Sequence, residues 1–107
     1  MEAGRLRHRI TLEQFTTSPD GAGGVTEAWV AFETVWAAVE PLRGREMVEH
    51  QQIQSGVTHR VRRRYRSGIN SKMRIKFGGR IFRIDSVINP DERNREMQLM
   101  CEEVAVP

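Results

Sequence analysis

The sequence predicts a mainly β protein, a small antiparallel β-barrel of six to seven strands with one excursion, a long loop or a short helix. Three observations predict this class. Apolar residues alternate with polar ones instead of recurring every third or fourth position. Turn-forming residues interrupt the alternation about every ten residues, and neither a repeat nor a linker divides the 107 residues. We therefore expect a single domain over residues 1–107, with the excursion at about 42–56.

The first part of the chain predicts three strands. They are expected at residues 7–15, 25–32 and 34–40, with a turn-rich loop at 18–24. In the first strand, Ile10 and Leu12 share one face while polar residues occupy the other, as in a half-buried strand. Trp29 and Trp36 are expected to anchor the edge of the core. Pro41 ends the third strand, because proline has no N–H to donate within a sheet.

The second part predicts four further strands, joined by turns at 67–70, 78–79 and 89–94. They are expected at residues 57–66, 73–77, 80–87 and 97–101. In the first of these, Val61 and Arg63 share a face, and Arg60 and Arg62 lie on the opposite one. Gly78-Gly79 predicts a two-residue hairpin with positive φ at both glycines.

The excursion at Gly44–Ser55 breaks the alternation. It contains good helix formers, but Met47 and Ile53 are the only residues that would make an apolar stripe, so it is either a short helix or an extended loop. Such a polar segment is either a partner contact or a solvated crossover. The residues expected at a partner or subunit interface are Arg43, Arg45, Glu46, Met47, Gln51, Gln52 and Ile53.

Charge is distributed unevenly along the chain. His50–Ile84 carries ten Lys or Arg and no Asp or Glu, whereas residues 1–49 and 85–107 are net acidic. Fifteen of the 17 basic residues are Arg, which forms forked bonds to carboxylates and phosphates. The basic segment can therefore pair with the protein's own acidic strands, with phosphates, or with the acidic face of another copy.

A basic row along the strand at 57–66 is the sharpest feature of this segment. Alternate arginines project from one sheet face about 6.8 Å apart, twice the rise per residue. The row is expected either to neutralise phosphates without reading base sequence, or to pair with Glu13, Glu27, Glu33 or Glu102 on adjacent strands or copies. Its members, with the following strand, are Arg60, Arg62, Arg64, Arg66, Lys72 and Arg74.

No catalytic, cofactor or metal site is expected. The sequence lacks a nucleophile elbow, a Walker loop and a dinucleotide fingerprint, and its three histidines have no partner at ligand spacing. Cys101 alternates with Leu99 on the inward face and is expected to be a packed thiol. The apolar runs are too short to span a membrane, and residues 1–5 do not resemble a secretory signal.

The chain resembles the phage head–tail joining proteins, the head-closure or head–tail adaptor family of long-tailed phages and prophages. The likeness runs over roughly residues 4–103 and rests on the order and spacing of short patterns. These are Gly4-x-Leu6-Arg7-His8-Arg9-Ile10-Thr11, Val35-Trp36-Ala37-x-Val39-x-Pro41-Leu42-x-Gly44-x-Glu46, Thr58-His59-x-Val61-x-x-Arg64-Tyr65-Arg66-x-Gly68-Ile69, Gly79-Arg80-x-Phe82-x-Ile84 and Arg95-x-x-x-Leu99-x-Cys101-Glu102.

The resemblance implies a structural virion protein at the head–tail interface, made in the bacterial host cytoplasm, with no catalysis and no cofactor. In such a role, copies form a ring below the portal and adaptor proteins, close the DNA-filled capsid and provide the surface on which the tail docks. The implied partners are other copies, portal and adaptor proteins, tail-completion proteins and, non-specifically, packaged double-stranded DNA. In such a ring, the basic row is expected to face either the DNA-containing lumen or the adjacent subunit. The alternative from the residues alone is a stand-alone nucleic-acid-binding β-barrel.

Overall fold

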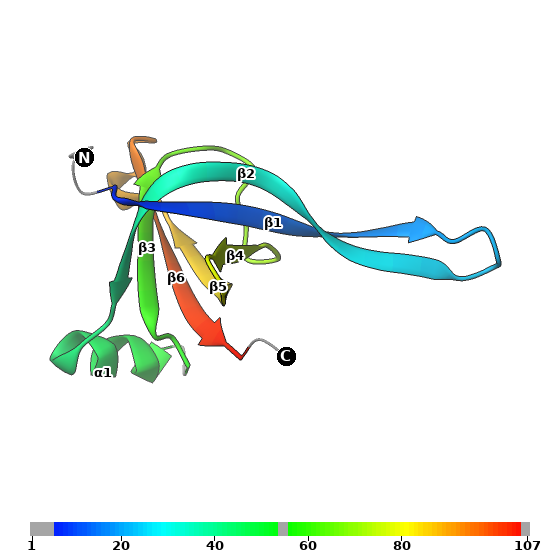
Figure 1. The fold of residues 1–107 in the computed structure, drawn as a ribbon. Coiled ribbons are helices and arrows are strands. Elements are labelled where there is room, and N and C mark those ends of the chain that lie inside the picture. Colours follow the sequence, from blue (N-terminus) through cyan, green and yellow to red (C-terminus); the bar gives the residue numbers. More distant parts are fainter. Residues whose placement is uncertain (1–5, 54–55, 106–107) are drawn as a thin grey trace.

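Six antiparallel strands close into a barrel in the computed structural model, which describes residues 6–53 and 56–105 (Figure 1). The strands follow the order β1-β2-β3-β6-β5-β4 around the barrel, and β4 pairs back onto β1. Closure pairs the strand edges that an open sheet would leave exposed. The strands are β1 (His8–Pro19), β2 (Val25–Pro41), β3 (His59–Arg64), β4 (Arg74–Phe77), β5 (Arg80–Ile88) and β6 (Glu96–Val104).

The predicted fold class is confirmed, with six strands because the second and third expected strands are one. β2 runs without interruption through Phe32. Leu12 pairs with Glu33 and Glu13 with Ala31, so Phe32 is an extra residue in β2, a β-bulge. The extra residue reverses the alternation, so the sequence pattern changes there although the strand continues.

The core lies inside the barrel, where the inward residues of all six strands meet. Phe82, Leu12, Ile75 and Leu99 are fully buried in it, and Cys101 is a packed thiol as predicted. Its buried members are Ile10, Leu12, Ala37, Val61, Ile69, Met73, Ile75, Phe82, Ile84, Met97, Leu99 and Cys101. The alternation identified most of these positions before the strands could be paired.

The expectation that both tryptophans anchor the core edge is wrong. Trp36 is 52% exposed, because it alternates with the inward residues Val35 and Ala37 and therefore points outward. Trp29 is half-buried outside the core and packs edge-on against Phe15, with ring centroids 5.3 Å apart. Both tryptophans therefore belong to the outer surface.

The excursion after β2 is a helix, α1 (Gly44–Ile53), which decides between the two predicted forms. It lies at the end of the barrel where β2 stops and β3 begins (Figure 1). Met47 packs on a small second cluster formed by Leu42, Val57 and Met100. A short 3₁₀ helix, η2 (Pro90–Glu92), occupies the predicted turn before β6.

The turn between β4 and β5 is the predicted two-residue hairpin, with Phe77 paired to Arg80. Gly78 has a φ of +60°, which L side chains rarely adopt. Gly79 is not among the residues with positive φ, so the expectation for the second glycine is wrong.

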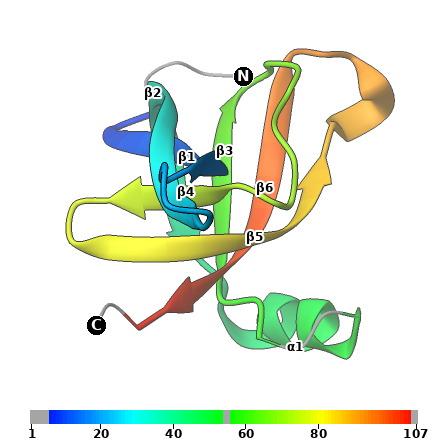
Figure 2. The ribbon, with the colours of Figure 1, turned by 90° about the vertical axis from the view of Figure 1, so that its right-hand side faces the viewer.

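Beyond the barrel, β1 and β2 continue as a two-stranded ribbon, here called the arm (residues 14–31). β1 pairs with β4 only from Thr11 to Glu13, and β2 pairs with β3 only from Ala38 to Pro41. The arm therefore projects from the barrel and gives the molecule extents of 51 × 28 × 26 Å (Figure 1). In Figure 2 the arm points toward the viewer and α1 lies at the lower end of the barrel. The described chain begins near the upper end.

The tip of the arm is held by its own hydrogen bonds. The Asp20 side chain accepts from the N–H groups of Ala22 (2.8 Å) and Gly24 (3.1 Å). These bonds hold the pKa of the Asp20 carboxyl below its usual value. The tip is therefore an ordered turn that carries a negative charge.

Candidate functional site

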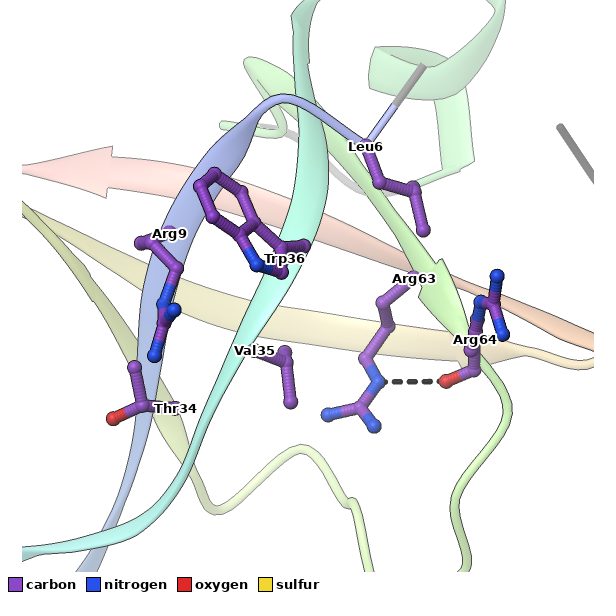
Figure 3. A pocket seen from close by; sticks show the side chains of 7 residues that line it. All are labelled: Leu6, Arg9, Thr34, Val35, Trp36, Arg63 and Arg64. Atoms are coloured by element: carbon purple, nitrogen blue, oxygen red, sulfur yellow. Dashed lines mark hydrogen bonds between the residues drawn. The ribbon is translucent and has the colours of Figure 1, made fainter. Parts of the chain in front are cut away.

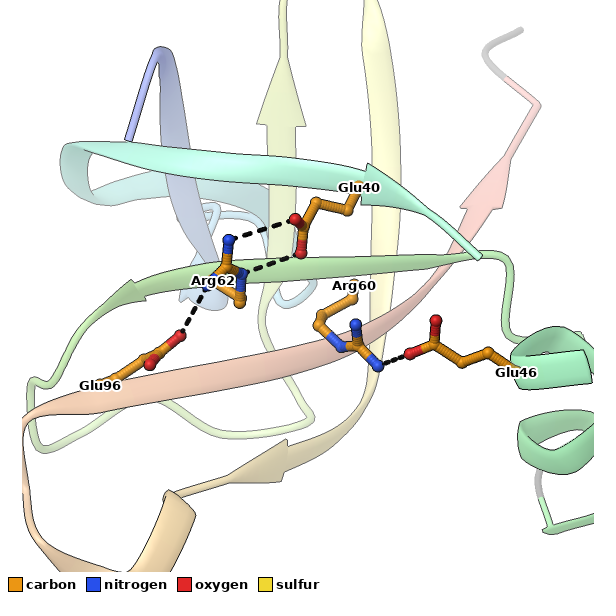
Figure 4. A network of polar contacts seen from close by, with 5 residues as sticks. All are labelled: Glu40, Glu46, Arg60, Arg62 and Glu96. Carbon is orange, nitrogen blue, oxygen red and sulfur yellow. Dashed lines mark hydrogen bonds and ion pairs between the residues drawn. The ribbon is translucent and has the colours of Figure 1, made fainter. Parts of the chain in front are cut away.

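The basic row on β3 lies on the outer barrel wall, as the alternation predicted, and two of its arginines are held by carboxylates (Figure 4). Arg62 donates a forked pair of hydrogen bonds to Glu40 on β2, at 2.9 and 3.1 Å, and lies 3.5 Å from Glu96 on β6. Arg60 pairs with Glu46 on α1. These contacts tie three neighbouring strands and the helix together.

Two further members of the row pair with carboxylates and also stack on aromatic rings. Arg74 binds Glu13 at 2.8 Å and lies 4.3 Å from the centre of the Trp29 ring. Arg66 binds Glu33 at 2.7 Å and covers the ring of Phe32. Four of the six predicted residues therefore pair with carboxylates of the same chain, but only Arg66 and Arg74 do so with partners named from the sequence, Glu33 and Glu13. The partners of Arg60 and Arg62, which are Glu46, Glu40 and Glu96, were not among those predicted.

Arg64 and Lys72 complete the row and differ from the rest. Both are exposed, and neither has a carboxylate within ion-pair distance among residues 6–53 and 56–105. Their charges are therefore available to another molecule. No pattern in the sequence separates these two residues from the other four, because alternation predicts the sheet face on which a side chain lies but not its ion-pair partner.

Because Arg62 is paired and Arg64 is not, reversing their charges is expected to change the free energy of unfolding by different amounts. Arg62→Glu places a third carboxylate between Glu40 and Glu96 and is expected to reduce the free energy of unfolding by about 2 kcal/mol. The matched control Arg64→Glu, on the same strand face, is expected to change it by less than about 0.5 kcal/mol. Urea unfolding of the purified variants measures both; equal losses would contradict the assignment of partners.

The residues predicted at a partner interface lie on α1 or just before it, but most of those described also have contacts within the chain. Glu46 pairs with Arg60, Met47 packs on the second cluster, and the Gln51 amide donates to the carbonyl of Val57 at 3.3 Å. The Arg45 side chain is 92% exposed and pairs with Glu49, one turn later on the helix, at 3.3 Å. Arg43 is exposed as well.

Gln52 and Ile53 form the last turn of α1. The structure places their backbone but does not describe their side chains, and Gln54 and Ser55 lie outside the described residues. The interface assignment for this segment therefore remains a prediction.

An open groove of about 600 Å³ lies on the barrel wall where β1 begins (Figure 3). Trp36, Val35 and Leu6 form its apolar lining, and Arg9 and Arg64 stand at its border. The Arg9 guanidinium lies 5.1 Å from the centre of the Trp36 ring. This groove was not predicted from the sequence, because Trp36 was expected at the edge of the core. The alternation of Trp36 with Val35 and Ala37 is the sequence pattern that indicates an outward-facing ring.

Arg63 is the buried charge of the barrel, 3% exposed, on the inward face where the alternation placed it. It pairs with Glu33, and its Nε donates to the carbonyl of Arg64 at 2.7 Å. Burial alone would raise the pKa of Glu33, but hydrogen bonds from Arg63 and Arg66 outweigh it and hold the pKa below the ordinary value of 4.5.

Within the described parts of the chain, the structure brings no metal-binding cluster together. No three His, Cys, Asp or Glu side chains converge there. Burial raises the pKa of the Cys101 thiol far above its usual range, so it is a poor nucleophile. Burial and then the charge of Arg80 lower the pKa of His59. In residues 6–53 and 56–105, no helix has the length and apolar character needed to cross a bilayer.

Comparison with known proteins gives one consistent result. Residues 1–104 match the family described as phage head completion protein. The chain is 29% identical over 106 residues to head completion protein gp7 of Enterobacteria phage HK97, covering 94% of this chain and 95% of that protein. It is 32% identical over 72 residues to head completion protein gp16 of Bacillus phage SPP1, covering 67% and 66% of the two chains.

Two solved structures share the fold along their whole length. The solution structure of protein SF1141 from Shigella flexneri 2a superposes with a TM-score of 0.81 at 30% identity, covering 100% of both chains. A chain of the virion of a native gene transfer agent particle superposes with a TM-score of 0.62 at 25% identity, covering 95% of this chain and 98% of that one. The chain belongs to the phage head completion protein family, which confirms the structural role in the virion, at the head–tail junction, that the sequence predicted.

Proposed function

We propose that copies of this protein form a ring below the portal and adaptor proteins, close the DNA-filled head and present the surface on which the tail docks. The observation that carries this proposal is the match of residues 1–104 to the head completion family. The barrel supports it physically, because its wall is rigidly cross-linked by ion pairs and its free charges lie at separate places on the surface.

The proposed contacts of the ring follow from exposed charges. Neighbouring copies and the portal-side proteins meet α1 and the residue before it, where Arg43 and Arg45 are exposed. Arg64 and Lys72 face either the packaged DNA, where they contact phosphates, or the next subunit, where they contact carboxylates. Dissolved salt weakens both kinds of contact. Tail-completion proteins bind the opposite surface of the ring. The protein acts by these contacts and catalyses no reaction.

A stand-alone nucleic-acid-binding barrel is the weaker candidate. Four of the six residues in the basic row already hold carboxylates of the same chain, which leaves few charges to neutralise phosphates. We therefore expect the isolated protein to bind duplex DNA weakly and with a shallow salt dependence.

Deleting the gene from a phage or inducible prophage tests the function. The expected particles are DNA-filled heads without tails that lose their DNA, and supplying the intact protein from a plasmid is expected to restore tailed particles. Electron microscopy of the lysate and nuclease protection of the packaged DNA measure both results. Normal numbers of tailed, infectious particles from the deletion would overturn the proposal.

A further inference from the structure

The arm exposes apolar side chains that a free protein would be expected to cover. Phe15 is 47%, Val25 63% and Val30 40% exposed. Beyond Glu13 and before Ala38, neither strand of the arm pairs with a third strand, so both edges of the ribbon carry unpaired backbone groups. A two-stranded ribbon in water is marginally stable by itself. These features are typical of a segment that is ordered against a partner.

The charge of the arm is of one sign. Residues 14–31 contain Asp20 and Glu27 and no Lys or Arg. Glu27 is exposed, and within the described chain it has no cation at ion-pair distance. A surface that covers the tip must therefore combine an apolar lining with positive charge.

The groove beside Trp36 has this combination. Leu6, Val35 and Trp36 supply the apolar lining, and Arg9 and Arg64 supply the charge (Figure 3). Arg64 has no carboxylate partner among residues 6–53 and 56–105. A cavity of about 600 Å³ is large enough for several side chains of an inserted turn.

A copy cannot fill its own groove. The groove lies where β1 begins, and the tip of the arm lies where β1 ends, 12 residues further along. An extended strand of this length separates the two by about 40 Å. Figure 1 shows the start of β1 and the tip of the arm at opposite ends of the molecule. A contact between them joins different surfaces of two copies, the head-to-tail type that closes into rings.

We propose that the tip of the arm in one copy docks in the Trp36 groove of the next copy. Pro19 and Val25, which face each other across the ribbon, lie against Trp36, and Glu27 faces Arg64. The occupant is thus a second copy of this chain. The inference rests on the proposed ring and names the contact that forms it.

A pair of engineered cysteines, Val25→Cys with Trp36→Cys, tests the contact in assembled particles. Both positions lie on β2, 11 residues apart, so they are far too distant for a bond within one chain. Cys101 is buried and does not compete. After mild oxidation of purified particles, we expect a ladder of disulfide-linked multimers on non-reducing gels, and none from either single variant.

The control pair is Val25→Cys with Ile88→Cys, since Ile88 is exposed (39%) but lies outside the groove. It is expected to give no ladder. A ladder of equal intensity from the control, a bond to a different virion protein, or particles that contain the double variant and show no ladder would each overturn the contact. Each of these results leaves the proposed closure function in place, because the protein is then still part of the purified particle. Absence of the natural protein from purified particles would instead contradict the closure function itself.

Charge reversal gives a second test that does not depend on replacing Trp36. Glu27→Arg and Arg64→Glu are each expected to reduce incorporation of the protein into heads by about tenfold, as for close charge pairs in interfaces. The double variant is expected to recover most of that loss. Incorporation is measured by quantitative blotting against the capsid protein. Single variants that incorporate normally, or a double variant as poor as the singles, would contradict the pairing.

Discussion

Replacing Phe82 with alanine is expected to lower the free energy of unfolding by about 3–5 kcal/mol, the largest effect of any single substitution in this barrel. The Phe82 ring is fully buried, at the point where β5 pairs with Ile75 of β4. His59 packs edge-on against it, with ring centroids 4.9 Å apart. Alanine leaves a cavity that neighbouring strands cannot fill, because each is fixed on both sides in a closed barrel.

Guanidinium denaturation of the purified variant measures this loss. A small domain has a total stability of about 5–15 kcal/mol, so the loss is a large fraction of the total and is expected to lower the denaturation midpoint markedly. Phe15→Ala is the matched control, since the same side chain is 47% exposed on the arm and its removal is expected to cost less than about 1 kcal/mol. Similar losses for both variants would show that the core is not centred on Phe82.

Replacing Glu33 with glutamine is expected to cost about 3 kcal/mol, because it leaves the Arg63 guanidinium buried without a counter-charge. Arg66 also loses its partner, but it is exposed enough for water to replace the carboxylate. The double variant Glu33→Gln with Arg63→Met removes both charges and is expected to recover most of the loss. A double variant as unstable as the single one would show that the pair contributes more than charge balance.

The same pair predicts how stability depends on pH. The pKa of Glu33 is lower in the folded protein than in the unfolded chain, so its contribution is fully present above the ordinary value of 4.5. It is lost as the pH falls below that value and the folded carboxylate takes up a proton. Denaturation midpoints measured from neutral pH downward are therefore expected to fall more steeply for the natural protein than for Glu33→Gln. Parallel curves would contradict the assignment.

Most of the barrel follows from the alternation of its residues. Val61 and Arg63 were placed on one face and Arg60 and Arg62 on the other, and burial agrees for all four. The bulge at Phe32 could not be predicted from the pattern, because an extra residue within a strand interrupts the alternation just as the end of a strand does. The arm was missed for a related reason: pairing beyond the barrel depends on where β4 stops, and no local pattern in β1 contains that information.

The candidate site was predictable only in part. The basic row lies on the expected face, but the face of a residue does not determine its ion-pair partner. Glu40 lies opposite Arg60 in the strand register, yet its carboxylate bonds diagonally to Arg62. Arg64 has no carboxylate partner among the described residues. The alternation of Trp36 with Val35 and Ala37 predicts that the ring points outward. The general tendency of tryptophan to be buried predicts the opposite, and here the alternation is correct. The surfaces proposed for assembly can therefore be located only once the pairing of the strands is known.

The seam between β1 and β4 also determines how the chain reaches its folded state. Its ion pair joins Glu13 to Arg74, 61 positions later in the sequence, and only three residue pairs hold the two strands together there. The segment between them must be restrained before these few contacts are made, which is an entropic cost that local hairpins such as β4–β5 avoid. Folding is therefore expected to be slow for a chain of this size, on the millisecond-to-second timescale of proteins rich in sequence-distant contacts, with the seam as its final step.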